Sequence, residues 1–379
     1  MISIPEWWML MACLAPAALF QWYLMAKFFL SKKTPEKNKS SSDVPVSLII
    51  CARNELENLK KNLPSWLGQN YPTYEVIVVN DRSWDDSRFF LEEMAAMHSN
   101  LRIVTVPENE KYWTGKKFAL TLGIKAAAYD TLLLTDADCR PASDRWMSYM
   151  MEGYELSQTE IVLGYGGYVQ SPGLLNLMIR FETLQTGWLY LSAAWAGWPF
   201  MGIGRNLSYK KNLFFGAKGF YRHMHIPSGD DDLFINQVAT GRNTRVMLNP
   251  EAVTFSTPKK TWSEYIYQRR RHFNTSFYYK TVTKIYLFFF QFSRLVVGLV
   301  TIASILGLSA GNQFYAAPLG LGLLYYTSRW RTMVIFSKRA GERSLGRWYP
   351  IMSILVFIVQ LRIWLQNILI GSPKGWKPN

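Results

Sequence analysis

The sequence predicts an α/β domain with a mostly parallel sheet, flanked at both ends by membrane-crossing helices. Short β-branched or Leu-rich runs at residues 46–53, 74–81, 101–106 and 131–138 alternate with helical stretches such as 54–69 and 87–99. This alternation is typical of a parallel sheet with helices on both faces. Long apolar runs precede and follow this region. Charged residues make up only 18% of the 379 positions, which is low for a wholly soluble protein.

The first predicted membrane span covers residues 7–30, a run of apolar or neutral residues with a Trp pair at one end. No small-residue cleavage site follows it, so we interpret it as a retained anchor rather than a signal peptide. The lysines after it place the next residues in the cytoplasm by the positive-inside rule. We expect residues 1–30 to anchor an inner-membrane protein and residues 31–43, rich in Lys and Ser, to form a polar linker.

The C-terminal third contains three further apolar runs, at residues 285–308, 314–328 and 348–370. The middle run is shorter and is interrupted by Gly and Pro. A basic loop is expected between the last two runs, on the cytoplasmic side; its residues are Arg329, Arg331, Lys338, Arg339, Arg343 and Arg347. The predicted organisation is a cytoplasmic domain at 44–280 and about three membrane helices at 281–379. The alternative is that some of these runs are buried helices of a soluble core.

An aromatic stripe occupies residues 181–200, where apolar side chains recur at steps of three and four. Its members are Phe181, Leu184, Trp188, Leu191 and Trp195. Two interpretations stand equally: core packing, or a helix lying where the cytoplasmic domain meets the bilayer.

Polar side chains follow three of the predicted strands. Arg53 and Glu55 follow the first strand, Asp81 ends the second, and Asp136 and Asp138 end the fourth. Ligands of such sheets bind outside the carboxyl ends of the strands, so these residues are expected to share one crevice. The first strand is not followed by a glycine loop of the GxxxxGK[ST] or GxGxxG kind, which argues against a P-loop or dinucleotide fold.

Asp136 and Asp138 are two carboxylates one residue apart at a strand end. Such a pair can present oxygens to one hard divalent cation, Mg or Mn, which in turn bridges a diphosphate. The bound cation would explain why a chain of net charge +15 has a local pair of carboxylates beside an anionic ligand, because the metal lies between them. The three cysteines and four histidines are too scattered for a zinc site, and the cysteines indicate a reducing compartment.

Several motifs, in order over residues 45–275, resemble those of the family 2 glycosyltransferases, which have a GT-A fold. "VSLIICARNELENL" resembles the opening strand and nucleotide loop, and "VIVVNDRSWDDS" the second-strand motif, with Asn80 in place of its first aspartate. "TGKKFALTLGI" resembles the segment whose lysine approaches the nucleotide, and "TDAD" the metal motif. "GIGRNLSYKKNLFFGAKGF" resembles the acceptor-side loop and "SGDDDLFINQ" the segment with the catalytic base. "QRRRH" resembles the QxxRW motif of membrane-embedded, often processive members, with His272 in place of the tryptophan.

The resemblance implies a role for each matched residue. Asp231 is expected to be the catalytic base, with Asp230 as the alternative one residue away; crowding of like charges also raises a carboxyl pKa, which suits a base. The metal ligands are expected to be Asp138 and Asp136. The residues expected to bind the nucleotide-sugar are Arg53, Glu55, Asp81, Lys116, Asp136, Gln268 and Arg271. A helix N-cap remains the alternative for Glu55 and Asp81, and a lipid-binding basic patch is the alternative for "QRRRH".

The function predicted on these grounds is a membrane-bound inverting glycosyltransferase that needs a divalent cation. It would transfer a sugar from a nucleotide-sugar, with UDP as the expected nucleotide, to a lipid or a growing polysaccharide, without a nucleic-acid partner. Four spans are few for a channel, which favours a lipid-linked acceptor over a processive synthase with a secretion channel. Two alternatives are a non-catalytic membrane protein that binds anionic lipid or nucleic acid, and a nucleotidyltransferase on a similar sheet.

Overall fold

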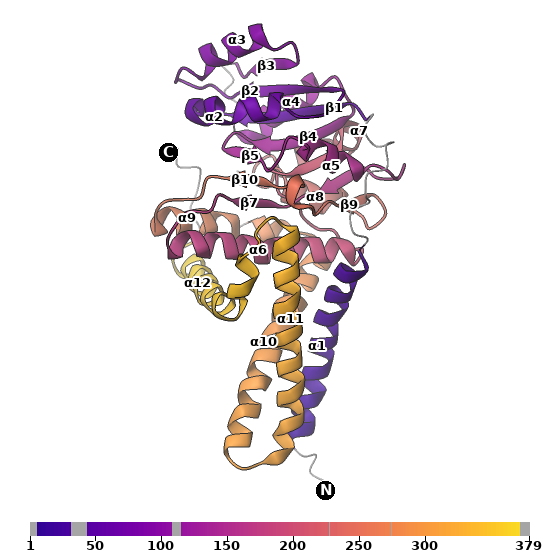
Figure 1. The fold of residues 1–379 in the computed structure, drawn as a ribbon, viewed down its shortest axis with the longest axis vertical. Coiled ribbons are helices and arrows are strands. Elements are labelled where there is room, and N and C mark those ends of the chain that lie inside the picture. The colour runs from indigo at the N-terminus through magenta and orange to yellow at the C-terminus, as the bar shows by residue number, and fades with distance from the viewer. Residues whose placement is uncertain (1–5, 32–43, 108–114, 227, 274, 372–379) are drawn as a thin grey trace.

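The computed structural model describes the chain except residues 1–5, 32–43, 108–114, 227, 274 and 372–379. Figure 1 shows a sheet domain at one end and a bundle of long helices projecting from it, with one helix, α6 (Leu174–Trp195), lying across the boundary. The predicted linker at 31–43 lies almost wholly outside the described residues.

A seven-stranded sheet in the order β3-β2-β1-β4-β8-β6-β9 forms the centre of the domain. Its first four strands are parallel, and only β8 runs against its neighbours. The bounds are β1 Val46–Ala52, β2 Tyr74–Asn80, β3 Leu101–Thr105, β4 Thr131–Asp136, β6 Ile161–Leu163, β8 Leu207–Lys210 and β9 Thr244–Val246. The four long strands match the predicted runs to within two residues. β1, β2 and β4 are mostly apolar and buried because helices cover both faces of the sheet.

The sheet is covered on both faces, which confirms the predicted fold class. One buried cluster joins the sheet to α2 (Leu56–Leu67) and α5 (Trp146–Glu152), and a larger one joins it to α4 (Lys116–Ala126) and α6. A second, three-stranded sheet comprises β5 (Cys139–Pro141), β10 (Thr254–Ser256) and β7 (Gly166–Tyr168). The other helices of the domain are α3 Ser87–Met97, α7 Lys211–Gly216, α8 Asp232–Val238 and α9 Trp262–Phe273.

The aromatic stripe on α6 packs into the core. Phe181, Leu184, Trp188 and Leu191 are fully buried, and Arg329 lies over the Trp188 ring at 4.4 Å from its centroid. Of the two interpretations of this stripe, core packing therefore accounts for these four residues, while Trp195 is half-buried.

Three long helices form the projecting bundle: α1 (Glu6–Leu30), α10 (Thr281–Ser309) and α11 (Ala316–Arg339). Polar side chains join them. Gln21 donates to the Ser293 hydroxyl at 2.8 Å, and Trp22 donates to the Ser328 hydroxyl at 2.8 Å. The described part of α1 and α10 is long and apolar enough to cross a membrane, as is the segment at 345–370, which contains α12 (Tyr349–Ile370).

The structure differs from two expectations at α11. Residues 316–328 of this run belong to a longer helix that continues to Arg339, and α11 is not among the helices apolar enough to be candidate spans. Four residues of the expected basic loop, Arg329, Arg331, Lys338 and Arg339, lie within this helix. The reason is that α11 reaches the domain, where Arg329 is buried against the aromatic rings of Trp188 and Tyr349.

Candidate active site

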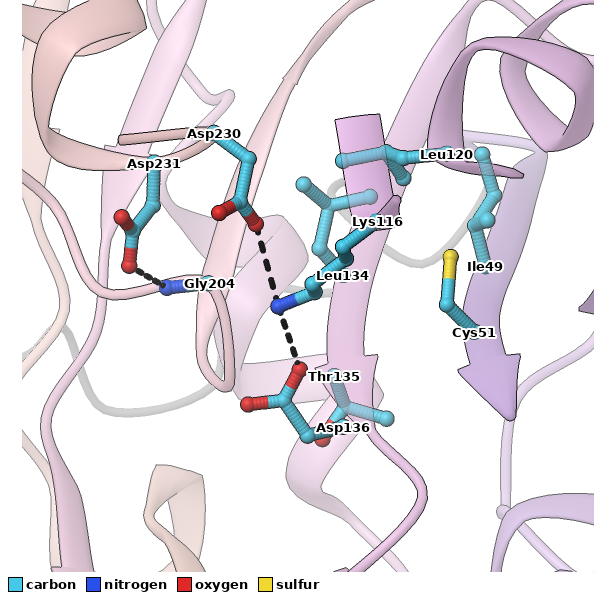
Figure 2. Close-up of a pocket in the computed structure, with 10 residues that line it drawn as sticks. All are labelled: Ile49, Cys51, Lys116, Leu120, Leu134, Thr135, Asp136, Gly204, Asp230 and Asp231. Atoms are coloured by element: carbon cyan, nitrogen blue, oxygen red, sulfur yellow. Dashed lines mark hydrogen bonds and ion pairs between the residues drawn. The ribbon is translucent and has the colours of Figure 1, made fainter. Parts of the chain in front are cut away.

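The carboxyl ends of β1 and β4 form one side of a small pocket. Figure 2 shows carboxylates from two distant chain segments facing one lysine inside it. The lining residues are Ile49, Cys51, Lys116, Leu120, Leu134, Thr135, Asp136, Gly204, Asp230 and Asp231. Four residues from separate motifs that were predicted to share one site therefore line the same pocket: Lys116, Asp136, Asp230 and Asp231.

Lys116 is the first residue of α4, and it reaches across the pocket. Its Nζ lies 2.7 Å from Asp136 Oδ1 and 3.0 Å from Asp230 Oδ2. Gly115 precedes it with φ +89°, a left-handed conformation that only glycine adopts without strain. This turn starts the helix in a direction that projects the lysine toward both carboxylates.

Asp231 is the N-cap residue of α8, and its carboxylate accepts two backbone hydrogen bonds. Gly204 N donates to Oδ2 at 2.7 Å, and Asp232 N donates to Oδ1 at 2.8 Å. Burial, together with the negative charges of Asp230 and Asp232, raises the pKa of Asp231 to about 7. A carboxyl group with this pKa can accept a proton near neutral pH.

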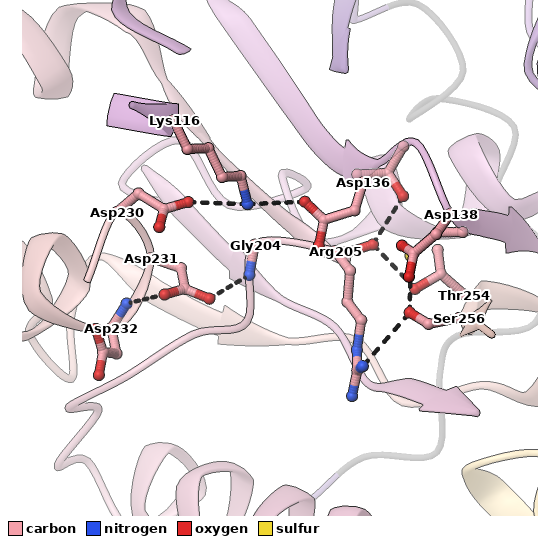
Figure 3. A network of polar contacts seen from close by, with 12 residues as sticks. Lys116, Asp136, Asp138, Gly204, Arg205, Asp230, Asp231, Asp232, Thr254 and Ser256 are labelled. Atoms are coloured by element: carbon pink, nitrogen blue, oxygen red, sulfur yellow. Dashed lines mark hydrogen bonds and ion pairs between the residues drawn. The ribbon is translucent and has the colours of Figure 1, made fainter. Parts of the chain in front are cut away.

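The three consecutive aspartates have different surroundings, as Figure 3 illustrates. Burial alone would raise the pKa of Asp230, but the charge and hydrogen bond of Lys116, together with the charge of Lys117, outweigh burial and lower that pKa. Asp232 instead accepts a hydrogen bond from the Tyr279 hydroxyl at 2.7 Å and does not line the pocket. The geometry therefore keeps Asp231 and Asp230 as candidates for the base and gives Asp232 a contact with the segment after α9.

Gly204 belongs to the predicted acceptor-side loop, but sequence reasoning did not single it out. A Cβ atom at this position would lie 3.5 Å from Asp231 Oδ2, 3.5 Å from Lys116 Nζ and 3.6 Å from Asp230 Oδ2. Glycine thus leaves an open space at the point where three charged atoms converge. The GxGRN pattern was the available signal, since glycines allow close backbone approach to a ligand.

The predicted metal ligands lie together at the end of β4. Ligand atoms of Asp136, Asp138 and Cys139 all lie within 4.8 Å of one another. Burial, followed by the charge of Asp136, raises the pKa of Asp138, so a nearby cation would stabilise its charged form. Burial raises the pKa of the Cys139 thiol well above its usual range, and its sulfur lies 2.9 Å from the Ser256 hydroxyl. The two carboxylates therefore fit a hard divalent cation, while the protonated thiol does not.

Of the residues expected to bind the nucleotide-sugar, Lys116 and Asp136 line the pocket, whereas Arg53, Glu55 and Asp81 lie at the ends of β1 and β2, outside the lining. Asp81 is buried and accepts from Arg82 Nη2 at 2.7 Å. Glu55 stands at the N-cap position of α2 without capping it, and accepts from Asn58 Nδ2 at 2.5 Å. The Arg53 guanidinium lies over the exposed Trp84 ring, 5.8 Å from its centroid. Neither carboxylate therefore acts as a helix cap.

The "QRRRH" residues lie on α9 and separate into different surroundings. Burial lowers the pKa of Arg271, opposed by the charge of Asp230, so Arg271 lies within electrostatic range of the pocket. Arg269 pairs with Glu182 at 2.6 Å, and Arg270 donates to Asn367 at 2.9 Å. Gln268 is half-buried. Of this motif, Arg271 and His272 are thus the residues whose pKa values are affected by the charge of Asp230.

Residues 47–215 match the family model described as glycosyl transferase family 2. The chain is 29% identical over 168 residues to a 4,4'-diaponeurosporenoate glycosyltransferase of Staphylococcus haemolyticus, covering 42% of this chain and 44% of that protein. It is 32% identical over 110 residues to a poly-β-1,6-N-acetyl-D-glucosamine synthase of Staphylococcus epidermidis, covering 29% and 25%. The matches thus span less than half the length of these curated relatives.

A solved structure of the mannosyltransferase PcManGT from Pyrobaculum calidifontis, in complex with GDP-Man and Mn²⁺, matches with a TM-score of 0.58. The match covers 97% of this chain and 99% of that one at 19% identity, a level at which it indicates the fold alone. With the family match, the sheet order and the acidic group after β4, these comparisons establish that the chain carries a family 2 glycosyltransferase domain with a GT-A fold.

Proposed function

We propose that the protein is a membrane-anchored inverting glycosyltransferase that transfers a sugar from a nucleotide-sugar, with UDP as the nucleotide, to a lipid-linked acceptor. The observation that carries the proposal is the position of Asp231. Its carboxyl group has a pKa of about 7 and lies in the same pocket as Lys116 and Asp136. A proton acceptor beside groups that can hold a diphosphate is what inverting sugar transfer requires.

In the proposed reaction Asp231 accepts the proton of the acceptor hydroxyl as the oxygen attacks the anomeric carbon. The backbone N–H of Gly204 holds the carboxylate in place. Lys116, and Arg271 from α9, would stabilise the negative charge of the departing nucleoside diphosphate. Asp81, Glu55 and Arg53 would contact the nucleoside.

Asp136 and Asp138 would hold a divalent cation, Mg²⁺ or Mn²⁺, which when bound supplies positive charge to the diphosphate. The PcManGT structure contains Mn²⁺ and GDP-Man, which supports testing Mn²⁺ and GDP-sugars alongside Mg²⁺ and UDP-sugars. The same assay then measures which nucleobase of the donor and which metal ion the enzyme prefers.

The membrane anchor is proposed from α1 and α10, whose lengths are about 37 Å and 43 Å at 1.5 Å per residue. Both exceed the ~30 Å hydrocarbon core of a bilayer. Their inner faces pack on each other and on α11 through side chains such as Gln21, Ser293 and Trp22. A bundle filled by its own side chains favours an acceptor that stays in the membrane over a polymer threaded through the same three helices. The basic residues of the domain favour the cytoplasm as its location.

The test uses the full chain in isolated membranes, supplied with UDP- and GDP-sugars, and measures nucleoside diphosphate release with and without a chelator. Asp231→Asn should lower turnover by about 10²- to 10⁴-fold, the usual contribution of a general base. Asp144→Asn is the matched control, because Asp144 is exposed and lies outside the pocket. Full turnover by Asp231→Asn would remove Asp231 from the base role.

Product analysis separates the remaining alternatives. One sugar per acceptor supports a lipid-linked acceptor, whereas a ladder of lengths indicates a processive synthase. Pyrophosphate release from a nucleoside triphosphate would indicate a nucleotidyltransferase. A non-catalytic lipid-binding protein would release nothing, and Asp138→Asn would change none of its properties.

A further inference from the structure

Helix α12 is long enough to cross a membrane but contacts the catalytic domain near its first turn, its middle and its end. Its 22 residues span about 33 Å, close to the thickness of the hydrocarbon core. Length and composition therefore do not distinguish a helix that crosses the bilayer from one that lies along its surface. The contacts of the helix do distinguish them.

The first turn of α12 contacts α6, since the Tyr349 ring lies 6.3 Å from the Phe181 ring. In the middle, Gln360 Nε2 donates to Glu182 Oε1 at 3.2 Å, again on α6. Glu182 is itself buried and accepts from the Tyr265 hydroxyl of α9 at 2.6 Å. The first two-thirds of α12 are thus fixed to the helix that lies across the base of the sheet domain.

The end of α12 is held by α9. Arg270 Nε donates to Asn367 Oδ1 at 2.9 Å, and Asn367 Nδ2 donates to the Arg270 carbonyl at 3.1 Å. Arg270 Nη2 also donates to the carbonyl of Gly371, directly after the helix. Both ends of α12 therefore lie in the layer formed by α6 and α9, whereas a crossing helix would carry one end about 30 Å away.

Figure 1 agrees with these contacts. It shows α1, α10 and α11 lengthwise as they leave the domain, but α12 nearly along its axis beside α6 and α9. The direction of α12 is thus transverse to the helices proposed to cross the membrane.

The two faces of α12 differ in what they contact. Tyr349, Met352, Val356 and Ile363 are buried, and the first three belong to the same core cluster as the apolar residues of α6. The opposite face is apolar and exposed, and comprises Ile351, Ile354, Phe357, Ile358, Leu361 and Leu365. Arg362 is the one charged residue in the helix. A continuous apolar face of this kind requires an apolar partner.

We propose that α12 lies in the plane of the membrane at its boundary on the catalytic side, with its exposed apolar face covered by lipid acyl chains. Lipid is the favoured occupant because α10 extends from the same side of the domain as α12 and also has an exposed apolar surface, which includes Leu295. Trp348, directly before α12, and Trp364 on α12 are half-exposed, and tryptophan favours the headgroup depth. Such a position fixes the height of the pocket above the bilayer. The inference rests on the membrane anchoring in the proposed function.

The first test compares which side of the membrane each end of α12 faces, using Ser→Cys variants of the full chain in sealed vesicles of both orientations. Ser157 marks the catalytic domain, Ser309 the far end of α10, Ser344 the approach to α12, and Ser372 the residue after Gly371. Ser157, Ser309 and Ser344 are exposed. A membrane-impermeant maleimide is applied, and mass spectrometry of the labelled peptides separates these sites from the three native cysteines.

The expected result is at least tenfold greater labelling of Ser157→Cys, Ser344→Cys and Ser372→Cys from one side, and of Ser309→Cys from the other. If Ser372→Cys is labelled from the same side of the membrane as Ser309→Cys, α12 crosses the bilayer and the proposal is overturned. If Ser309→Cys labels from the same side as Ser157→Cys, the crossing of α10 fails instead. Failure of the anchoring and failure of the α12 placement thus give different patterns.

The second test identifies what covers the exposed face. A bimane probe on Ile358→Cys is reconstituted in phosphatidylcholine vesicles with lipids brominated near the glycerol or near the chain end. Stronger quenching by the shallow bromines is expected, and Leu295→Cys on α10 is the control, for which the deep bromines should quench more strongly. Lack of quenching at Ile358→Cys would mean that protein, such as a second copy, covers this face, and stronger deep quenching would mean that α12 lies within the bilayer core. Either outcome would overturn the proposal.

Discussion

The charges around Asp231 predict that two substitutions shift the pH dependence of activity in opposite directions. Lys116→Met removes the cation that lowers the pKa of Asp231, so this pKa should rise above about 7. Asp230→Asn removes the neighbouring negative charge that raises the pKa of Asp231, so this pKa should fall. A base is competent when deprotonated, so kcat/KM should decline as the pH falls through its pKa.

The size of each shift follows from the geometry at Gly204. Asp231 Oδ2, Lys116 Nζ and Asp230 Oδ2 all lie within 3.6 Å of one point above the Gly204 backbone. Any two of them are therefore at most roughly 7 Å apart, where two unit charges interact by about 2 kcal/mol at an effective dielectric constant of about 20. At ~1.4 kcal/mol per pKa unit, each substitution should move the acid limb by about one to two pH units.

The assay measures nucleoside diphosphate release under conditions that report kcat/KM between pH 5 and 9 for the wild type, both variants and Asp144→Asn. The readout is the midpoint of the acid limb, because a loss of phosphate contacts by Lys116→Met lowers the plateau without moving the midpoint. Asp144→Asn should have the wild-type midpoint, since Asp144 does not line the pocket. A common direction of shift, or no shift in either variant, would refute the electrostatic account of the base.

Three further predictions concern the pocket, the metal and the fold. Gly204→Ala should not change the stability of the protein, because the added methyl group makes ordinary contacts of 3.5–3.6 Å. It should lower kcat/KM about 10-fold or more by displacing the acceptor. Gly216→Ala, with open space around it, is the control, and equal kcat/KM values for the two variants would contradict the role of Gly204. Asp138→Asn should raise the Mn²⁺ concentration for half-maximal activity about 10- to 100-fold, and an unchanged titration would exclude it as a ligand. Glu182→Gln should lower the free energy of unfolding by about 3–5 kcal/mol, because Arg269 loses its buried anion; an unchanged Tm in detergent would count against that pair.

The strands of the sheet were predictable because their residues satisfy a local rule. The runs ending at Ala52, Asn80 and Asp136 are mostly apolar, as strands covered on both faces tend to be. The placement of Asp136 in a pocket followed from the same rule, since ligands bind at the carboxyl ends of parallel strands. These inferences needed no knowledge of any distant contact.

The rest of the site depends on contacts that a pattern of residue types does not encode. Lys116 entered through a family resemblance, because nothing in local spacing indicates that a lysine at a helix start will bridge two carboxylates. Gly204 was missed because it contributes a backbone N–H and an open space instead of a side chain. The separate surroundings of Asp231 and Asp232 depend on where α8 begins and on Tyr279, which lies 47 residues after Asp232.

The C-terminal helices illustrate the same limit for membrane segments. Hydropathy selects the part of the chain at 345–370 and leaves out α11, although α11 runs within the bundle. Hydropathy measures how apolar a helix is, but not its direction. That direction depends on a few polar side chains, Gln360 and Asn367 on α12 and their partners Glu182 and Arg270. A hydropathy calculation over a sliding window counts such polar side chains only as unfavourable residues and ignores their partners.

The position of Lys116 couples the base to the donor. In the pocket its ammonium contacts Asp136 and Asp230 together, and that charge keeps the pKa of Asp230 low. Donor phosphate oxygens that draw the ammonium away from Asp230 would raise the proton affinity of the Asp230–Asp231 pair. We therefore expect the acid limb of kcat, which reports the donor-bound enzyme, to lie at higher pH than that of kcat/KM, which reports the free enzyme. Coincident limbs in the wild type would mean that Lys116 stays between its two carboxylates when the donor binds.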